Sequence, residues 1–151
     1  MNRIFFPGSF NPFTVGHADL LKRMLTLADK VTVGIGVNID KISESGAAEE
    51  NKNAIMQFLI KEGLDDRVDV VVYSGLSAEE AIRRGADCLA RGVRNATDFD
   101  YEYSLASANK EVFGIETVFL AADPKLSFVS STLVRDLEKN NKKDIASRFI
   151  P

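Results

Sequence analysis

The chain has 151 residues, of which 45% are hydrophobic and 27% charged, as in ordinary globular proteins that dissolve in water. Its formal net charge of −3 excludes the broad basic surface that nucleic-acid binding requires, although a local group of arginines can still bind a small anion. The lone Cys88 excludes a disulfide framework and a cysteine zinc site. Apolar runs are too short to span a membrane, and Pro7 and Gly8 come too early for a signal peptide, so we expect one cytoplasmic domain over residues 1–151.

Short β-rich segments alternate with helical ones along the chain. The predicted strands are residues 3–6, 30–37, 67–73, 87–90 and 116–121. The predicted helices are residues 16–28, 47–61, 77–85, 97–113, 130–139 and 143–149. This alternation predicts an α/β fold, a single doubly wound Rossmann-like domain whose five-stranded parallel sheet is covered on both faces.

Polar residues at three helix starts are expected to act as caps. They are Ser77 with Glu80 three residues on, Thr97, and Ser130 or Ser131. In sheets of this kind, ligands bind beyond the carboxyl ends of the strands. Candidate functional residues follow the strands in order: Ser9 and His17, then Lys41, then Leu76 and Ser77, then Arg91 and Arg94, then residues 127–132. The sheet is expected to gather them at one edge.

The loop Gly8–His17 predicts a phosphate site. Gly8 allows close approach to the backbone, and Ser9 adds an N–H and a hydroxyl. His17 is the only histidine and lies at a helix start, where free N–H groups and the helix dipole favour an anion. We expect His17 to donate to a phosphate oxygen; the alternative is that it only caps the helix.

A second pattern runs from Arg91 to Glu102. Two arginines three residues apart, with Gly92 between them, can clamp phosphates, although a solvated charged loop is the commoner use of this spacing. Asn109 lies two helical turns after Glu102, on the same helix face. Apolar residues of this helix are expected in the core or at a subunit interface: Phe99, Leu105 and Val112.

A third pattern places consecutive hydroxyls at a helix start, in residues 126–132. Side-chain hydroxyls and free N–H groups there can bind phosphates, and a simple N-cap is the alternative.

These patterns resemble known families. Gly8–His17 resembles the G-x-F-x-P-x-x-x-G-H signature of the nucleotidyltransferase superfamily, and residues 91–102 resemble the R-G-(L/V)-R-x-x-x-D-F-x-Y-E segment of the phosphopantetheine adenylyltransferase family. Residues 126–132 are similar to segments of both that family and the nicotinamide-nucleotide adenylyltransferases. The second segment distinguishes the first family from its relatives.

The resemblance implies transfer of the adenylyl group of ATP to 4'-phosphopantetheine, giving dephospho-CoA and pyrophosphate in coenzyme A biosynthesis. It also implies Mg²⁺ accompanying ATP, CoA as a feedback ligand, a homohexamer, no protein-held metal, and no nucleic-acid or membrane partner. The catalytic residues it implies are His17, Lys41 and Arg91. The acceptor-binding residues it implies are Ser9, Lys41, Leu76, Ser77, Arg91 and Asn109. The ATP-binding residues it implies are Ser9, Phe10, His17, Gly92, Val93, Arg94, Glu102, Leu126, Ser127, Phe128, Val129, Ser130, Ser131 and Thr132.

The chain departs from the family at several positions. Ser9 replaces a threonine but keeps the hydroxyl, Ser77 replaces an apolar residue, and Leu126 replaces a tryptophan. Residues 48–52 lack the arginine of a Glu-Glu-Arg segment, and the C-terminal helix of the family is expected to be missing. The alternatives are another transferase of the superfamily, a non-catalytic nucleotide-binding regulator, or part of a larger ligase.

Overall fold

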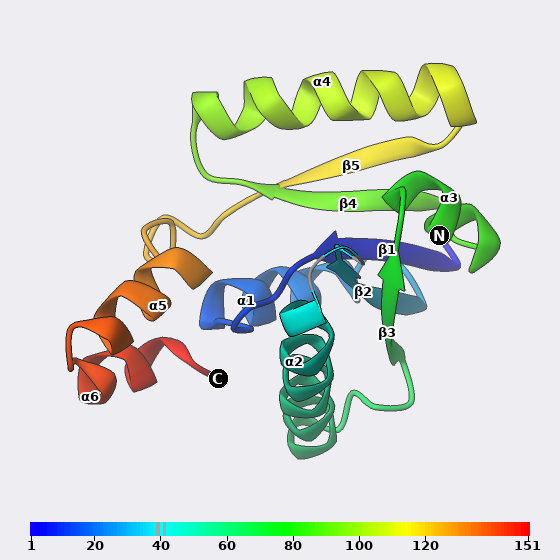
Figure 1. Ribbon diagram of the computed structural model, residues 1–151. Helices are drawn as coiled ribbons and strands as arrows, with labels where there is room; N and C mark the ends of the chain where they lie inside the picture. Colours follow the sequence, from blue (N-terminus) through cyan, green and yellow to red (C-terminus); the bar gives the residue numbers. More distant parts are fainter. Residues whose placement is uncertain (39, 41) are drawn as a thin grey trace.

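The computed structural model describes residues 1–38, 40 and 42–151, without the side chains of residues 42–45. Its strands are β1 (Arg3–Gly8), β2 (Lys30–Val37), β3 (Val68–Ser74), β4 (Cys88–Val93) and β5 (Glu116–Ala121). Its α-helices are α1 (Val15–Met24), α2 (Ile42–Glu62), α3 (Ser77–Arg83), α4 (Ala96–Phe113), α5 (Ser131–Lys139) and α6 (Lys143–Ala146), and a 3₁₀ turn, η1 (Ser147–Phe149), follows (Figure 1).

The five strands form one parallel sheet in the order β3-β2-β1-β4-β5. The predicted α/β fold is therefore confirmed. The chain builds the sheet outward from β1 in one direction and then returns to place β4 on its other side. In such sheets the carboxyl ends of the two strands at this reversal, here β1 and β4, are the usual place for a ligand.

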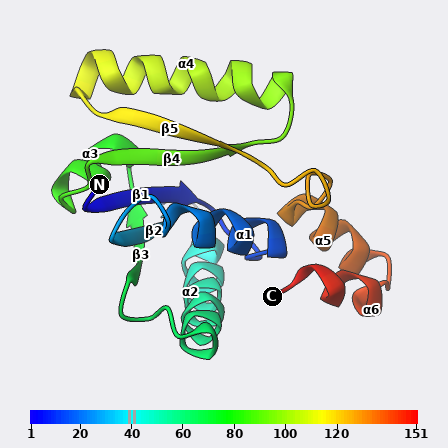
Figure 2. The same ribbon diagram turned by 180° about the vertical axis from the view of Figure 1, so that it is seen from behind.

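Alternate residues of β1 pack into two separate cores, because successive side chains of a strand point to opposite faces. Ile4 and Phe6 join the larger core with residues of α1 and α2. Phe5 joins the smaller core with residues of α3 and the end of α4. Figures 1 and 2 agree that α4 runs beside β4 and β5, while α5 and α6 lie beyond the end of the sheet near α1. Among the described helices, none is both long and apolar enough to cross a membrane.

β4 extends three residues beyond its predicted end. Arg91, Gly92 and Val93 pair in register with Phe119, Leu120 and Ala121 of β5, so the expectation that Arg91 lies in the loop after the strand was wrong. The arginine is accommodated in a central strand because a carboxylate of α4 binds it, as described below.

Two predicted helix caps were also wrong. Leu76 occupies the N-cap position of α3 without a side-chain hydrogen bond, because the Ser77 hydroxyl bonds to Tyr73 instead. Asn95, not Thr97, caps α4, and its side chain accepts from the Asp98 N–H. The predicted Ser130 cap of α5 is confirmed.

Gly34 of β2 tests how tightly the two cores constrain the sheet. A Cβ at this position would lie 2.3 Å from Cζ of the fully buried Phe5, whose ring also packs edge-on against Tyr73. We therefore expect Gly34→Ala to lower the free energy of unfolding by about 1–3 kcal/mol, measured by urea denaturation.

Gly46→Ala in α2 is the matched control, because a Cβ there meets none of the described atoms outside its own stretch of helix within 4 Å. This substitution should stabilise the protein by about 0.5–1 kcal/mol, since alanine loses less backbone entropy in a helix than glycine. Equal effects of the two substitutions would contradict the packing argument.

Candidate functional site

Two cavities open at the carboxyl ends of the central strands and share one wall. The first has a volume of about 310 Å³ and the second about 270 Å³. Both are lined by Pro7, Gly8, Ser9, Arg91 and Glu102. We call the first the α1 pocket, because residues of α1 and of the loop into α5 complete it: His17, Asp19, Leu20, Val129, Ser130 and Ser131. We call the second the α4 pocket, because α4 completes it with Tyr101, Leu105, Ala106 and Asn109.

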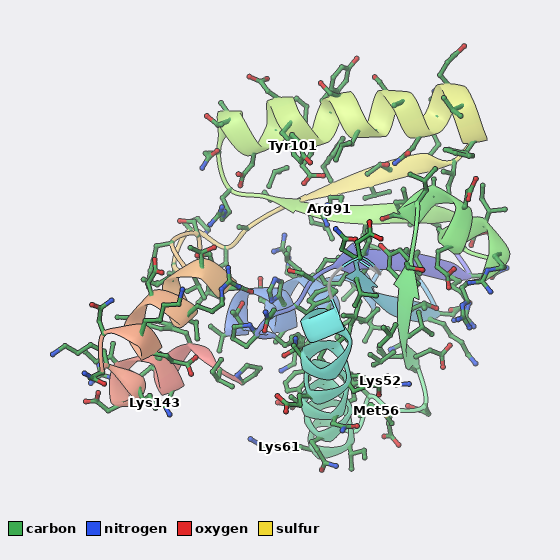
Figure 3. All side chains as sticks on the ribbon, in the orientation of Figure 1. Lys52, Met56, Lys61, Arg91, Tyr101 and Lys143 are labelled. Carbon is green, nitrogen blue, oxygen red and sulfur yellow. The ribbon has the colours of Figure 1, made fainter. Side chains whose placement is uncertain are left out.

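Arg91 is held at the junction of the two pockets. Its Nε and Nη2 donate to the two carboxylate oxygens of Glu102 at 2.9 and 2.7 Å, and its Nη1 donates to the Pro7 carbonyl at 2.5 Å. Glu102 is buried, while one third of the Arg91 side chain remains exposed. Figure 3 shows Arg91 on β4 and Tyr101 on the neighbouring α4. The paired guanidinium keeps a fixed orientation that both pockets can use.

His17 both caps α1 and lines the α1 pocket. Its Nδ1 accepts from the Thr14 N–H at 3.0 Å, while its own backbone N–H donates to the Thr14 hydroxyl. Because Nδ1 is the acceptor, the neutral ring carries its proton on Nε2. The capping interpretation is therefore confirmed, and it leaves an Nε2–H donor available.

Burial in this aromatic surrounding, together with the smaller effect of the positive charges of Arg91 and Arg94, lowers the pKa of His17 from 6.5 to about 4. The imidazole centroid lies 4.9 Å from that of Phe10 and 5.6 Å from that of Phe13. At neutral pH the ring is thus an uncharged hydrogen-bond donor, which can bind an oxyanion without itself carrying charge.

The start of α5 is tied to the first loop. Ser130 accepts from the Leu133 N–H at 3.0 Å, and the Ser131 hydroxyl donates to the Pro12 carbonyl at 2.7 Å. Arg135 donates to the Asn11 carbonyl. These bonds bring together two sequence patterns that are more than a hundred residues apart.

Arg94 forms a second cation–carboxylate pair at the mouth of the α1 pocket. Its Nε and its backbone N–H both donate to Asp98 Oδ2, at 3.0 and 3.2 Å. The hydrogen bond from the Arg94 side chain is the main cause of the lowered pKa of Asp98, which therefore stays ionised.

The structure brings most of the predicted site residues to these two pockets. Those in the α1 pocket are Ser9, Phe10, His17, Arg91, Gly92, Arg94, Glu102, Leu126, Val129, Ser130 and Ser131. Those in the α4 pocket are Ser9, Ser77, Arg91, Glu102 and Asn109. The ring of Phe10 is buried under the first loop, so this residue has its backbone, rather than its ring, to offer a ligand.

Other predicted residues lie outside both pocket linings or outside the described part of the chain. The former are Leu76, Val93, Ser127, Phe128 and Thr132. The Phe128 ring packs edge-on against Phe149 instead. Lys41 lies outside the described residues.

Sequence interpretation missed several pocket residues. Tyr73, Tyr101 and Thr117 line the α4 pocket, and Asp98 lines the α1 pocket. Asp98 could have been found from its spacing of four residues after Arg94 on a helix start. Tyr73 and Thr117 lie in strands, where an isolated polar group gives no local signal.

Comparison with known proteins gives relatives over nearly the full chain. A family model described as cytidylyltransferase-like matches residues 5–137. The phosphopantetheine adenylyltransferase of Cytophaga hutchinsonii is 43% identical, and the match covers 97% of this chain and 94% of that protein. The phosphopantetheine adenylyltransferase of Bacteroides thetaiotaomicron is 39% identical, with 100% and 96% covered.

Solved structures share the fold at low identity. A bifunctional NMN adenylyltransferase/ADP ribose pyrophosphatase from Francisella tularensis superposes with a TM-score of 0.67 at 19% identity, over 93% of this chain and 42% of that one. The Plasmodium falciparum nicotinic acid mononucleotide adenylyltransferase superposes with a TM-score of 0.63 at 14% identity, over 99% of this chain and 90% of that one.

The lowered pKa of His17 predicts a pH-dependent stability. Between pH 6.5 and about 4 the unfolded chain binds a proton that folded His17 does not, so the free energy of unfolding falls as the pH falls through this range. Because the ring is partly open to the pocket, we expect a loss of up to about 2 kcal/mol from this group.

The measurement is urea denaturation at pH 7 and pH 4.5 for the unaltered chain and for His17→Gln. The difference between the two proteins isolates His17 from carboxylates that titrate in both. An identical pH dependence in the two proteins would contradict the prediction.

Removal of the Glu102 charge should loosen Arg91. In Glu102→Gln one carboxylate oxygen becomes an NH₂ that cannot accept from the guanidinium, and a partly buried cation loses its counter-charge. We expect the free energy of unfolding to fall by about 1–3 kcal/mol. Glu111→Gln, an exposed position on the same helix, is the control and should change it by less than about 0.5 kcal/mol. Equal unfolding midpoints for the two variants would refute the role of the pair.

Proposed function

The chain belongs to the phosphopantetheine adenylyltransferase family, and on this premise we propose that it transfers the adenylyl group of ATP to 4'-phosphopantetheine. The products are dephospho-CoA and pyrophosphate, in coenzyme A biosynthesis. The observation that supports this most is the pair of adjoining pockets whose common wall holds Ser9 and Arg91. A group transfer between two substrates needs two binding sites that meet at the reacting atoms.

In the proposed reaction, a phosphate oxygen of the acceptor attacks the α-phosphorus of ATP in line. One O–P bond forms, and the bond from the α-phosphorus to the bridging oxygen of pyrophosphate breaks. A phosphate oxygen is already ionised at neutral pH, so no protein base is needed. The protein contributes positioning and stabilisation of the charge that develops on the α-phosphate oxygens.

The α1 pocket is the proposed ATP site. Ser9 and the Nε2–H of His17 would donate to α-phosphate oxygens, and Ser130, Ser131 and the free N–H groups of α5 would bind the remaining phosphates. Arg94 would add charge at the pocket mouth. The other proposed ATP contacts follow from family membership: Phe10, Gly92, Val93, Glu102, Leu126, Ser127, Phe128, Val129 and Thr132.

The α4 pocket is the proposed acceptor site. Arg91 lies between the pockets, where it would hold the phosphate of the acceptor toward the α-phosphate. Lys41 is proposed as its cationic partner from family membership alone. Ser77 and Asn109 line the wall along which the pantetheine arm would extend, and Leu76 would contact this arm from the start of α3.

Mg²⁺ is proposed to arrive as part of the MgATP substrate. Among the described side chains that line the α1 pocket, four are carboxylates and two are arginines, so these side chains alone do not neutralise a triphosphate. The described residues contain no group of three His, Cys, Asp or Glu side chains that could hold a metal ion. Both facts suit an ion held mainly by phosphate oxygens and water.

A homohexamer in the cytoplasm is the proposed state of the protein, with CoA as a feedback ligand, on family membership. Five large apolar or aromatic side chains of α4 are between 43% and 69% exposed in the single chain: Phe99, Tyr101, Tyr103, Leu105 and Val112. Phe99, Leu105 and Val112 are therefore not buried in the core of the single chain, which supports the proposed subunit interface. Leu105 also lines the α4 pocket.

His17→Ala tests the proposed function. Loss of one preorganised donor to the α-phosphate should lower kcat by about 10²–10³-fold, with the fold retained. The assay is pyrophosphate release from Mg²⁺, ATP and 4'-phosphopantetheine, with thermal unfolding of each protein as the check on folding.

The same assay with nicotinamide mononucleotide in place of 4'-phosphopantetheine is the substrate control. Release by the unaltered chain with nicotinamide mononucleotide alone would overturn the proposed acceptor. A near-normal rate in His17→Ala would remove His17 from the mechanism without changing the proposed substrates.

A further inference from the structure

The wall of the α4 pocket contains a pair of hydroxyls that neither the fold nor the proposed transfer step requires. Tyr73 Oη and Ser77 Oγ lie 2.7 Å apart, and both residues line the pocket. Tyr73 is at the end of β3 and Ser77 begins α3. This pair joins two elements at the pocket wall.

The position of Tyr73 is fixed by packing. The residue is buried, and its ring meets Phe5 edge-on with the ring centroids 5.6 Å apart. A Cβ on Gly36 would come within 3.3 Å of the Tyr73 hydroxyl, so the glycine leaves room for this group at the pocket. Burial raises the pKa of the tyrosine, so its hydroxyl keeps its proton at neutral pH.

Ser77 does not cap α3, although its position in the sequence predicts that it would. A serine three residues before Glu80 would normally cap the helix, yet α3 has no side-chain cap and the serine hydroxyl bonds to Tyr73. The serine hydroxyl therefore forms part of the pocket lining together with Tyr73 and does not bond to the helix N–H groups.

The remaining bonding capacity of the pair matches one chemical group. Two hydroxyls carry two hydrogens, and their mutual bond uses one of them together with one lone pair. One O–H donor and several lone pairs remain at the same place. A secondary amide offers the complementary set, a carbonyl acceptor and an N–H donor. Leu89, Leu105 and Ala106 line the same pocket, and hydrogen bonds are strengthened beside such apolar groups.

One further hydroxyl in the lining of the α4 pocket lacks a protein partner. Among the described residues, Thr117 Oγ1 is the buried side-chain oxygen or nitrogen without a hydrogen-bond partner. Thr117 pairs in register with Leu89, and both line the α4 pocket. Thr117 is on β5 and Tyr73 on β3, at opposite edges of the sheet, so this hydroxyl is a separate polar group in the lining of the same pocket. A buried hydroxyl without a protein partner favours a polar ligand there over an apolar one.

We propose that the Tyr73–Ser77 hydroxyl pair binds an amide group in the arm of the acceptor and so makes this site selective for amide-bearing acceptors. This inference rests on the proposed function, because that function supplies an acceptor whose phosphate sits at Arg91 and whose arm occupies the α4 pocket. Tyr73 and Ser77 are binding residues in this scheme and take no part in the transfer step.

The test compares Tyr73→Phe and Ser77→Ala with the unaltered chain in the pyrophosphate-release assay. Each substitution removes one neutral hydrogen-bonding group, so the KM for 4'-phosphopantetheine should rise about three- to tenfold while kcat and the KM for ATP change less than twofold. An n-alkyl phosphate of the same chain length, which has no amide, should inhibit all three proteins with the same Ki within twofold.

Tyr103→Phe and Ser104→Ala are matched controls. Tyr103 is exposed on α4, and the Ser104 hydroxyl donates to the Asp100 carbonyl within that helix. Neither residue lines the α1 pocket or the α4 pocket. Both controls should keep the KM of the unaltered chain. Thermal unfolding of every variant separates a binding effect from a loss of folding.

The outcomes distinguish the two proposals. A rise in KM below threefold in both pocket variants, or an equal rise in the Ki of the alkyl phosphate, would overturn amide recognition and leave the proposed function in place. Absence of turnover of 4'-phosphopantetheine by the unaltered chain would overturn both.

Discussion

The bidentate pair between Arg91 and Glu102 is the interaction on which the two-pocket arrangement depends. One guanidinium joins β4 to α4 through the carboxylate and β4 to β1 through the Pro7 carbonyl. Buried ion pairs often contribute less stability than the apolar residues that could replace them. The better explanation for a charged pair beside the central strands is that it holds a cation where both pockets meet.

The charge of the site is arranged in pairs rather than as an open basic surface. Arg91 is paired with Glu102 and Arg94 with Asp98, while His17 stays neutral because burial and both arginines disfavour its protonated form. Such a site fits a chain whose net charge is −3. In the proposed function it would provide directed hydrogen bonds to phosphate oxygens, and ions that accompany the substrate would complete the neutralisation.

Hydrophobic periodicity predicted the strands and helices, because apolar residues recur at every second position of a strand and at every third or fourth position of a helix. Two of the failures come from side-chain hydrogen bonds that periodicity does not report. Ser77 does not cap α3 because Tyr73 binds its hydroxyl, and β4 continues through Arg91 because Glu102 neutralises the guanidinium and β5 continues the pairing. The third failure is local. Asn95, two residues before Thr97, caps α4, and asparagine is at least as favoured as threonine at the N-cap position.

The two pockets also differ in how well the sequence predicts their residues. The α1 pocket is built mainly from three contiguous segments: the first loop, residues 91–102 and the start of α5. Hydrogen bonds from Ser131 and Arg135 hold the first and the last of them together. Contiguous segments leave recognisable patterns, so the sequence predicts most residues of the proposed phosphate-binding half. The α4 pocket takes single residues from several strands and helices, including Tyr73 and Thr117, and no local pattern marks them. In the proposed function, selection of the acceptor would therefore depend on the residues that are hardest to find by sequence alone.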